Sequence, residues 1–139
     1  MNASKRGFSL IELLVVIAII GVLAGIAMAS YDAYVVRAHR SAAQGFMMQV
    51  ANKQSQYILD ARNYAVGSTA LTSLSLTVPP DVSPFYTVAV ENGTGGTTVA
   101  TPPSFRVRAT PVVGSKQAND GELILTNTGA KTKGGASGW

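Results

Sequence analysis

The chain has 139 residues, enough for one small domain, and 47% of them are apolar, which is ordinary for a folded protein. Its formal net charge is +4, but Lys5 and Arg6 lie in the first seven residues, and without them nine basic and seven acidic residues remain. That surplus is too small to predict a polyanionic partner from charge alone. The chain has no cysteine, so no disulfide can reinforce its fold.

The amino terminus combines a short polar leader with a long apolar segment. Residues 1–7 (MNASKRG) are basic and polar, and an apolar run follows at once, from Phe8 to Ala29. A secretory signal would be cut after such a run, and Ala27-Met28-Ala29 offers a suitable pattern of small residues. The run is nevertheless about 20 residues long, against about 7–15 in secretory signals. We therefore predict that residues 8–30 form a membrane-spanning helix that is kept.

Glu12 lies inside this apolar run, where an ionisable side chain is costly and functional by default. Cleavage between Gly7 and Phe8 would create a new α-amine at the start of the helix. A buried carboxylate is acceptable when a cation pairs with it. We therefore predict that Glu12 pairs with the amine of Phe8 in a neighbouring identical subunit. The alternative is that Glu12 lies at the level of the lipid headgroups and is only tolerated.

The segment from Lys5 to about Tyr34 resembles the prepilin signal of type IV pilins and of their pseudopilin relatives. The shared features are a basic residue, a glycine, an aromatic residue, a glutamate at the fifth position after the cut, and a long apolar run. The resemblance implies that a prepilin peptidase cleaves after Gly7 and methylates the amine of Phe8. It also implies that the helix holds the subunit in the inner membrane until the assembly machinery adds it to a filament, with Glu12 pairing during docking. The chain departs from the family at Ala29, where relatives usually carry a proline.

Beyond Ala29 the pattern becomes amphipathic, and residues 31–62 are expected to continue the same helix to about Ala61. The residues of the predicted apolar stripe recur at helical spacing: Tyr31, Val35, Ala38, Ala42, Phe46, Val50, Tyr57 and Ala61. His39 has no carboxylate or second histidine at ligand spacing, so we interpret it as a surface residue and predict no metal site.

Residues 63–139 are expected to form a small β-sheet head. Residues 65–83 are rich in Ser, Thr and Pro and predict a loop with a short turn. Three strands are predicted, at residues 85–91, 105–110 and 122–127, with a turn at residues 92–98. Three short antiparallel strands need a partner surface, which the amphipathic half of the helix supplies. The predicted fold class is therefore α+β, with a long amino-terminal helix packed on a small antiparallel sheet, as in the pilin fold.

The second half of the chain resembles the small PilE-type minor pilins. The shared stretches are Ala43 to Tyr57, the segment NDGELILTNTGAK, and a terminal Gly-Trp. Those relatives commonly carry two cysteines, at the places where Asp120 and Gly138 stand here. Without that disulfide, we predict that the tail of residues 131–139 is held only by packing of Trp139, or not at all.

No catalytic constellation is evident: the chain has one histidine and no cysteine, and the acidic residues outside Glu12 are scattered singly. We expect no enzyme activity, no cofactor and no metal. Arg106 and Arg108 alternate with apolar residues, which is typical of a solvated strand face, although such a pair could contact DNA. The Asn92-Gly93-Thr94 glycosylation sequon is interpreted as a chance match.

The leading hypothesis is therefore a structural subunit of a type IV pilus, and a minor subunit rather than the major one. It would serve assembly, adhesion or twitching motility as part of a polymer with other pilin subunits. It would be a single-pass inner-membrane protein before assembly and part of a cell-surface fimbrium afterwards. The alternatives are a type II secretion pseudopilin and a DNA-binding pilin for uptake.

Overall fold

The computed structural model describes residues 8–139, apart from the side chain of residue 29. The predicted leader, residues 1–7, and with it the cleavage residue Gly7, lies outside the described residues. The chain divides into two compact units, one that ends at Val35 and one that comprises Val36–Trp139. Each is described by itself below.

One helix, α1 (Leu10–Ala61), continues through both units for 52 residues, which confirms the prediction of a helix reaching about Ala61. It remains helical through residues 28–30, where relatives carry the proline that this chain lacks. An alanine keeps the backbone N–H that proline would remove, so the ladder of helical hydrogen bonds can continue there.

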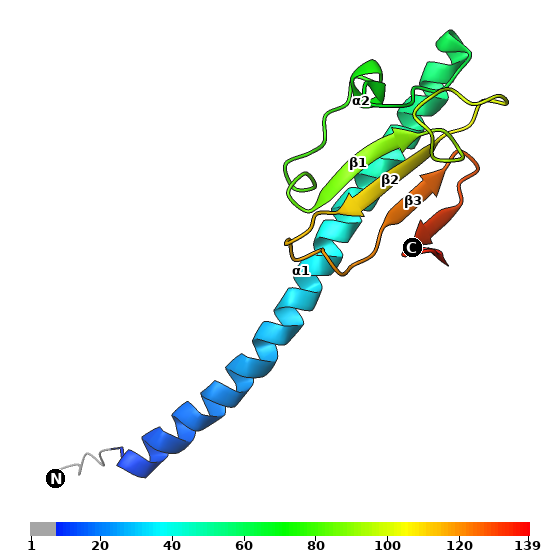
Figure 1. The fold of residues 1–139 in the computed structure, drawn as a ribbon. Coiled ribbons are helices and arrows are strands. Elements are labelled where there is room, and N and C mark those ends of the chain that lie inside the picture. Colours follow the sequence, from blue (N-terminus) through cyan, green and yellow to red (C-terminus); the bar gives the residue numbers. More distant parts are fainter. Residues whose placement is uncertain (1–7) are drawn as a thin grey trace. The chain divides into compact units, whose positions relative to one another are not determined.

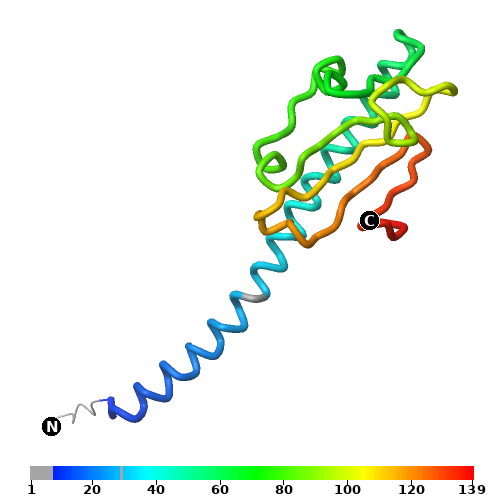
Figure 2. Tube along the Cα trace, viewed as in Figure 1, coloured from blue at the N-terminus to red at the C-terminus, as the bar shows by residue number. Residues whose placement is uncertain are grey.

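The second unit contains a five-stranded antiparallel sheet packed on the carboxy-terminal part of α1 (Figure 1). Its strands run in the order β1-β2-β3-β4-β5, and their bounds are Tyr86–Glu91, Arg106–Pro111, Leu123–Thr126, Lys131–Lys133 and Ala136–Ser137. The three predicted strands correspond to β1, β2 and β3. A one-turn helix, α2 (Ala70–Ser73), interrupts the segment between α1 and β1. This connecting segment runs beside β1 in the chain trace (Figure 2).

The core lies between α1 and the inner face of the sheet. From α1 it receives Ala43, Phe46, Met47 and Val50, all at most 4% exposed. The predicted stripe was right at Phe46 and Val50 but wrong at its ends. Tyr31, Ala38 and Ala61 are exposed, because the head covers only the middle of the predicted stripe.

Gln54 is a fully buried polar residue in this core and was not predicted there. Its side-chain Oε1 accepts a hydrogen bond from the N–H of Ala65 at 3.0 Å, and its Nε2 donates to the carbonyl of the same residue. These two bonds satisfy the buried amide and tie the loop that follows α1 back onto the helix. A hydrophobic pattern cannot find such a position, because its burial depends on a partner eleven residues away.

The predicted state of the tail is wrong. Residues 131–139 add two strands to the sheet: β4 pairs with β3, and β5 pairs with β4. Trp139 contributes as well, since its Nε1 donates to the carbonyl of Ile124 at 3.3 Å and Lys131 Nζ lies 4.6 Å from its ring centroid. Main-chain pairing, rather than Trp139 alone, therefore holds the tail.

Candidate functional site

Reciprocal hydrogen bonds cap the start of α1. The N–H of Ser9 donates to Oε2 of Glu12 at 3.0 Å, and the N–H of Glu12 donates to Oγ of Ser9 at 3.3 Å. This is a capping box, in which two backbone donors that the first helical turn leaves without partners are satisfied. Glu12 therefore has a role within its own chain, one that the Ser-x-x-Glu spacing signals and that the sequence analysis missed. Phe8, directly before this cap, is 79% exposed.

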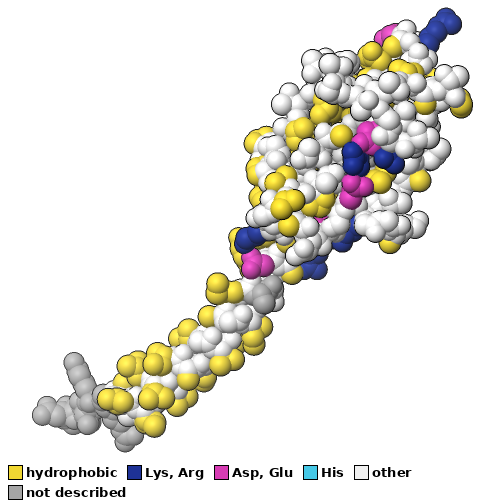
Figure 3. All heavy atoms as spheres, in the orientation of Figure 1, with side chains coloured by type: hydrophobic (Ala, Val, Ile, Leu, Met, Phe, Trp, Pro, Cys, Tyr) yellow, Lys and Arg dark blue, Asp and Glu magenta, His cyan; other side chains and the backbone are white. Residues whose placement is uncertain are grey.

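Large apolar side chains cover the amino-terminal part of α1 (Figure 3). An 18-residue window of this helix has a mean hydropathy of 2.9, and none of that window is buried within the structure. By length and composition the helix can cross a membrane. Such a continuous apolar surface needs lipid or other apolar helices around it.

A cluster around Asp120 joins four segments of the head. Its carboxylate accepts hydrogen bonds from Arg40 Nε at 2.7 Å, from the hydroxyl of Tyr86 at 2.6 Å and from Gln117 Nε2 at 3.2 Å. Arg40 Nη2 bonds to its other oxygen, and Lys133 Nζ lies 3.3 Å from that oxygen. The Asp120 side chain is only 3% exposed. The cluster therefore connects α1, β1, the turn before β3, and β4.

Electrostatics keep this cluster charged at neutral pH. Burial raises the pKa of the Asp120 carboxyl, but the hydrogen bonds from Arg40 and Tyr86 and the charge of Arg40 outweigh burial, so that pKa lies below its ordinary value. Burial and the bond to Asp120 together raise the pKa of Tyr86 to about 12. The hydrogen bond to Asp120 also raises the pKa of Arg40. Asp120 thus stays a carboxylate, and Arg40 and Tyr86 stay protonated.

Asp120 stands at one of the two positions where the resemblance places a cysteine. Relatives would fix their carboxy-terminal loop there with a covalent bond, whereas this chain has a carboxylate that binds Lys133 of β4. The same carboxylate also binds Arg40, which lies 80 residues away on α1. No local sequence signal could predict a pair so far apart.

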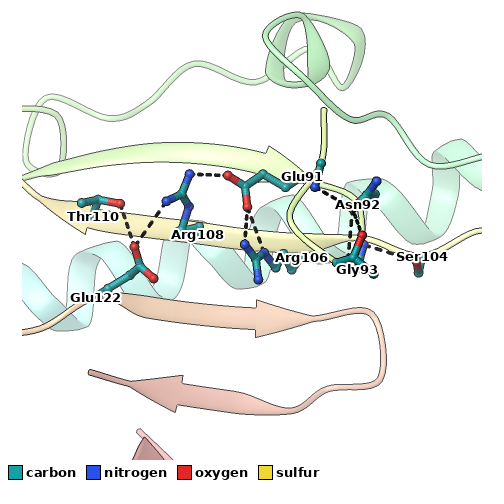
Figure 4. Close-up of polar contacts among 10 residues, drawn as sticks. Glu91, Asn92, Gly93, Ser104, Arg106, Arg108, Thr110 and Glu122 are labelled. Atoms are coloured by element: carbon teal, nitrogen blue, oxygen red, sulfur yellow. Dashed lines mark hydrogen bonds and ion pairs between the residues drawn. The ribbon is translucent and has the colours of Figure 1, made fainter. Parts of the chain in front are cut away.

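A second set of ion pairs lies on the outer face of the sheet (Figure 4). Glu91, 6% exposed, accepts from Arg106 Nε at 2.9 Å and forms an ion pair with Arg108. Arg108 Nη1 also lies 3.6 Å from Glu122, which accepts from the hydroxyl of Thr110 at 3.2 Å. The prediction that the two arginines lie on a solvent-facing side of the strand is right, since their side chains are 26% and 36% exposed. The predicted basic character of that face is wrong, because Glu91 of β1 and Glu122, directly before β3, form ion pairs with them.

The turn after β1 is organised by Asn92, which is 8% exposed. Its Oδ1 accepts from the N–H of Thr94 at 3.0 Å and from that of Gly96 at 2.7 Å, and its Nδ2 donates to the carbonyl of Thr98 at 2.9 Å. The predicted turn at residues 92–98 is confirmed. The nitrogen that a glycan would occupy is engaged inside this turn.

In the part of the chain that the structure describes, no group of three or more His, Cys, Asp or Glu side chains is placed to hold a metal ion. The chemistry that the described residues offer is therefore an apolar helix with one carboxylate near its start, and a head held by ion pairs.

Comparison with known proteins places these features in a family. Residues 2–28 match the model of the prokaryotic N-terminal methylation motif, and residues 29–123 match the model described as type IV minor pilin ComP, DNA uptake sequence receptor. The second match covers more than half of the chain.

Individual relatives agree with the family models. The type IV major pilin protein PilE1 of Neisseria gonorrhoeae is 36% identical over 95 residues, which are 67% of this chain and 52% of that protein. A fimbrial protein of Neisseria meningitidis serogroup A is 34% identical over 102 residues, 72% of this chain and 58% of the relative. A fimbrial protein of Moraxella nonliquefaciens is 60% identical over 43 residues, 31% of this chain and 27% of that protein.

The chain thus spans little more than half the length of the two Neisseria relatives. Residues 29–123 match a pilin model and residues 2–28 match the methylation motif, so family membership does not rest on the apolar segment alone. The chain belongs to the type IV pilin family, in the group that the ComP minor pilin model describes.

Proposed function

We propose that this protein is a structural subunit of a type IV pilus. The observation that carries the proposal is the pairing of a pilin head with an exposed apolar helix that lies within an N-terminal methylation motif. After cleavage behind Gly7 and methylation of Phe8 by a prepilin peptidase, the helix holds the subunit in the inner membrane. The assembly machinery then transfers it to the filament, where helices of neighbouring subunits replace lipid around the apolar surface. This is a structural role, without catalysis.

Glu12 would select the docked position. In the described residues its carboxylate already accepts the N–H of Ser9, and a carboxylate can accept further hydrogen bonds. The amine of Phe8 in a neighbouring subunit would supply the cation that a carboxylate needs once water is excluded. Pairing at one height along the helix would set the axial register between subunits.

We assign the chain to a minor subunit because the family model that covers its head describes a minor pilin. The Neisseria gonorrhoeae relative is a major pilin, so the assignment to a minor subunit rests on the family model that matches residues 29–123. Quantifying this chain by mass spectrometry in sheared filaments distinguishes the two. A minor subunit is a small fraction of the filament protein, whereas a major one dominates it.

Processing should depend on the absence of a side chain at Gly7, where the peptidase must approach the backbone closely. Replacing Gly7 by valine should leave the leader attached, so the intact mass of the membrane-extracted protein should include residues 1–7. Ala3→Val, a similar enlargement away from the cut, serves as the control and should be processed normally. Normal cleavage of the Gly7→Val protein would contradict the predicted site.

Reception of DNA during uptake is the second candidate function, and the description of the matching family favours it. The charges of the head do not make it the first choice. Arg106 and Arg108, the pair with which the sequence suggested DNA contact, both form ion pairs with Glu91. Few phosphate contacts remain available to a mature chain with nine basic and seven acidic residues.

Binding of DNA by residues 31–139 should therefore be weak and should disappear at physiological salt, as measured by fluorescence anisotropy. Submicromolar binding at that salt, abolished by Arg106→Ala and Arg108→Ala together, would establish the uptake hypothesis instead. Glu91→Gln is the matched control, because it removes the negative charge that both arginines share without removing the arginines. It should strengthen any binding that uses them.

A further inference from the structure

β1 is an edge strand of the five-stranded sheet, so one side of its main chain has no neighbouring strand (Figure 1). In an antiparallel pair, residues alternate between those whose N–H and C=O groups bond to the neighbouring strand and those whose groups point away from it. The carbonyl of Phe85 accepts from the N–H of Val112 at 2.9 Å, which extends the pairing of β1 with β2 by one residue. The alternate residues Tyr86, Val88 and Val90 therefore direct their main-chain groups to the open side.

The chain itself covers the two ends of this open side. The N–H of Tyr86 donates to the carbonyl of Val82 at 2.9 Å, and the carbonyl of Val90 accepts from the N–H of Gly67 at 2.8 Å. Four groups lie between these bonds: the carbonyl of Tyr86, the N–H and carbonyl of Val88, and the N–H of Val90. Among the residues that the structure describes, none bonds to these four groups. The uncovered stretch from Tyr86 to Val90 is about 13 Å long at 3.3 Å per residue.

A groove of about 310 Å³ borders this uncovered stretch. Its lining includes the apolar side chains of Leu71, Val88 and Val90, and the ion pair of Glu91 with Arg108 on the outer face (Figure 4). Since the two charges of that pair cancel, the groove does not favour a charged ligand. It offers instead a row of main-chain donors and acceptors beside an apolar surface.

This combination matches an extended polypeptide. An antiparallel segment with its central residue opposite Val88 would exchange two hydrogen bonds with Val88. Its flanking peptide groups would donate to the carbonyl of Tyr86 and accept from the N–H of Val90. Three extended residues thus satisfy all four groups. The central side chain would lie on the same face as that of Val88, which packs against the core, so an apolar residue fits there.

The edge strands of a second copy do not fit this groove. Gly67 and Val82 occupy the positions that a continuing strand would use, so an added segment must leave the edge at both ends. A second β1 continues beyond the uncovered stretch in both directions. The other edge strand, β5, has only two residues, and Gly135 and Gly138 beside it have φ of +84° and +92°, which an extended strand does not have.

From these observations we infer that the uncovered edge of β1 binds a partner protein by strand addition. The partner contributes a loop or terminal segment of three extended residues with an apolar residue at its centre. All the residues that form this site belong to the unit Val36–Trp139, so the contact is independent of the apolar helix. It gives the head a partner that is not another copy of the chain.

The test traps a model segment on the full chain in detergent micelles. Because the chain has no cysteine, Ser68→Cys can be its only thiol, and Ser68 is exposed and lines the groove beside Gly67. The probe is the peptide acetyl-Cys-Gly-Gly-Thr-Val-Thr-amide, equilibrated with the protein in a glutathione redox buffer. Mass spectrometry measures the fraction of chain that is disulfide-linked to the peptide. Thr128→Cys, exposed in the turn after β3, is the matched control.

We expect Ser68→Cys to trap the peptide at least tenfold more than Thr128→Cys does, because the tether raises the local concentration of a segment that fits the groove. N-methylation of the central valine removes the donor to the carbonyl of Val88 and should reduce trapping to the control level. Val88→Pro, combined with Ser68→Cys, should do the same. Its N–H points away from β2, so the sheet should persist, as circular dichroism can verify.

Three results would overturn the inference. Equal trapping at residues 68 and 128 would show that the groove does not select the peptide. Unchanged trapping of the N-methylated peptide would show that the edge is not read as a strand. Disulfide-linked dimers of Ser68→Cys that form in preference to the peptide adduct, and that Val88→Pro suppresses, would assign the groove to a second copy.

Discussion

Glu12→Ala should still be cleaved and inserted, but its incorporation into filaments should fall several-fold, with processed protein accumulating in the inner membrane. The peptidase is expected to act on the residues around Gly7, and the bilayer accepts the apolar run, so neither step needs the carboxylate. Assembly does, because the amine of Phe8 loses water in the filament and an unpaired buried charge costs several kcal/mol. Comparing the chain in sheared filaments and in membranes by quantitative immunoblotting measures the effect.

Two further variants separate the roles of Glu12. Glu12→Gln keeps the shape and can still accept the N–H of Ser9, but it lacks the charge, so it should assemble as poorly as Glu12→Ala. Ser9→Ala removes the hydroxyl half of the capping box and keeps the charge. It should cost the helix about 1 kcal/mol locally and leave assembly near normal. If Glu12→Ala entered filaments at the normal level, Glu12 would be only a tolerated interfacial residue.

The second large effect is expected in the head. Asp120→Asn should lower the free energy of unfolding of residues 31–139 by about 3 kcal/mol. Breaking a buried ion pair typically costs 3–5 kcal/mol, and the lower end applies because Arg40 and Lys133 remain partly exposed. Urea unfolding monitored by circular dichroism measures the change. Lys133→Met is the matched control and should cost less, since it removes one contact and leaves Arg40 paired.

The same pair predicts a pH dependence. The pKa of Asp120 is lower in the folded head than the ordinary 3.8, so its contribution to stability is complete only well above that ordinary value and is lost as the pH falls through the folded value. The parent head should therefore lose more stability on acidification below pH 4 than Asp120→Asn does. If the free energy of unfolding of the two proteins fell in parallel with pH, Asp120 would not hold the head together. The same would follow if Asp120→Asn lowered the free energy of unfolding by less than about 0.5 kcal/mol.

Most of the fold could be predicted because its signals are local. Helical periodicity located α1 to within two residues. Runs of strand-forming residues bounded by turns located β1, β2 and β3. The strands of the tail, Lys131–Lys133 and Ala136–Ser137, have no such pattern. Their pairing depends on β3 being in place beside them, so the sequence of residues 131–139 (KTKGGASGW) does not predict it.

Some residues of the candidate site could be predicted from local sequence signals, and others could not. Gly7, Phe8 and Glu12 follow one another in a contiguous motif, so sequence alone could propose them. The Asp120 cluster brings together residues up to 80 positions apart, and only the folded chain shows that one carboxylate joins the tail to α1. The sequence shows that the chain has no cysteine at the two positions where relatives carry one. It does not show that Asp120, at one of these positions, forms ion pairs with Arg40 and Lys133.

The central claim is that this chain is processed as a pilin and polymerised through its amino-terminal helix. Mass spectrometry of purified, sheared filaments tests it most directly. The account predicts that the chain is present there and begins at an N-methylated Phe8. A mature chain that begins after Ala29, or one that is confined to the soluble fraction and never enters filaments, would contradict it.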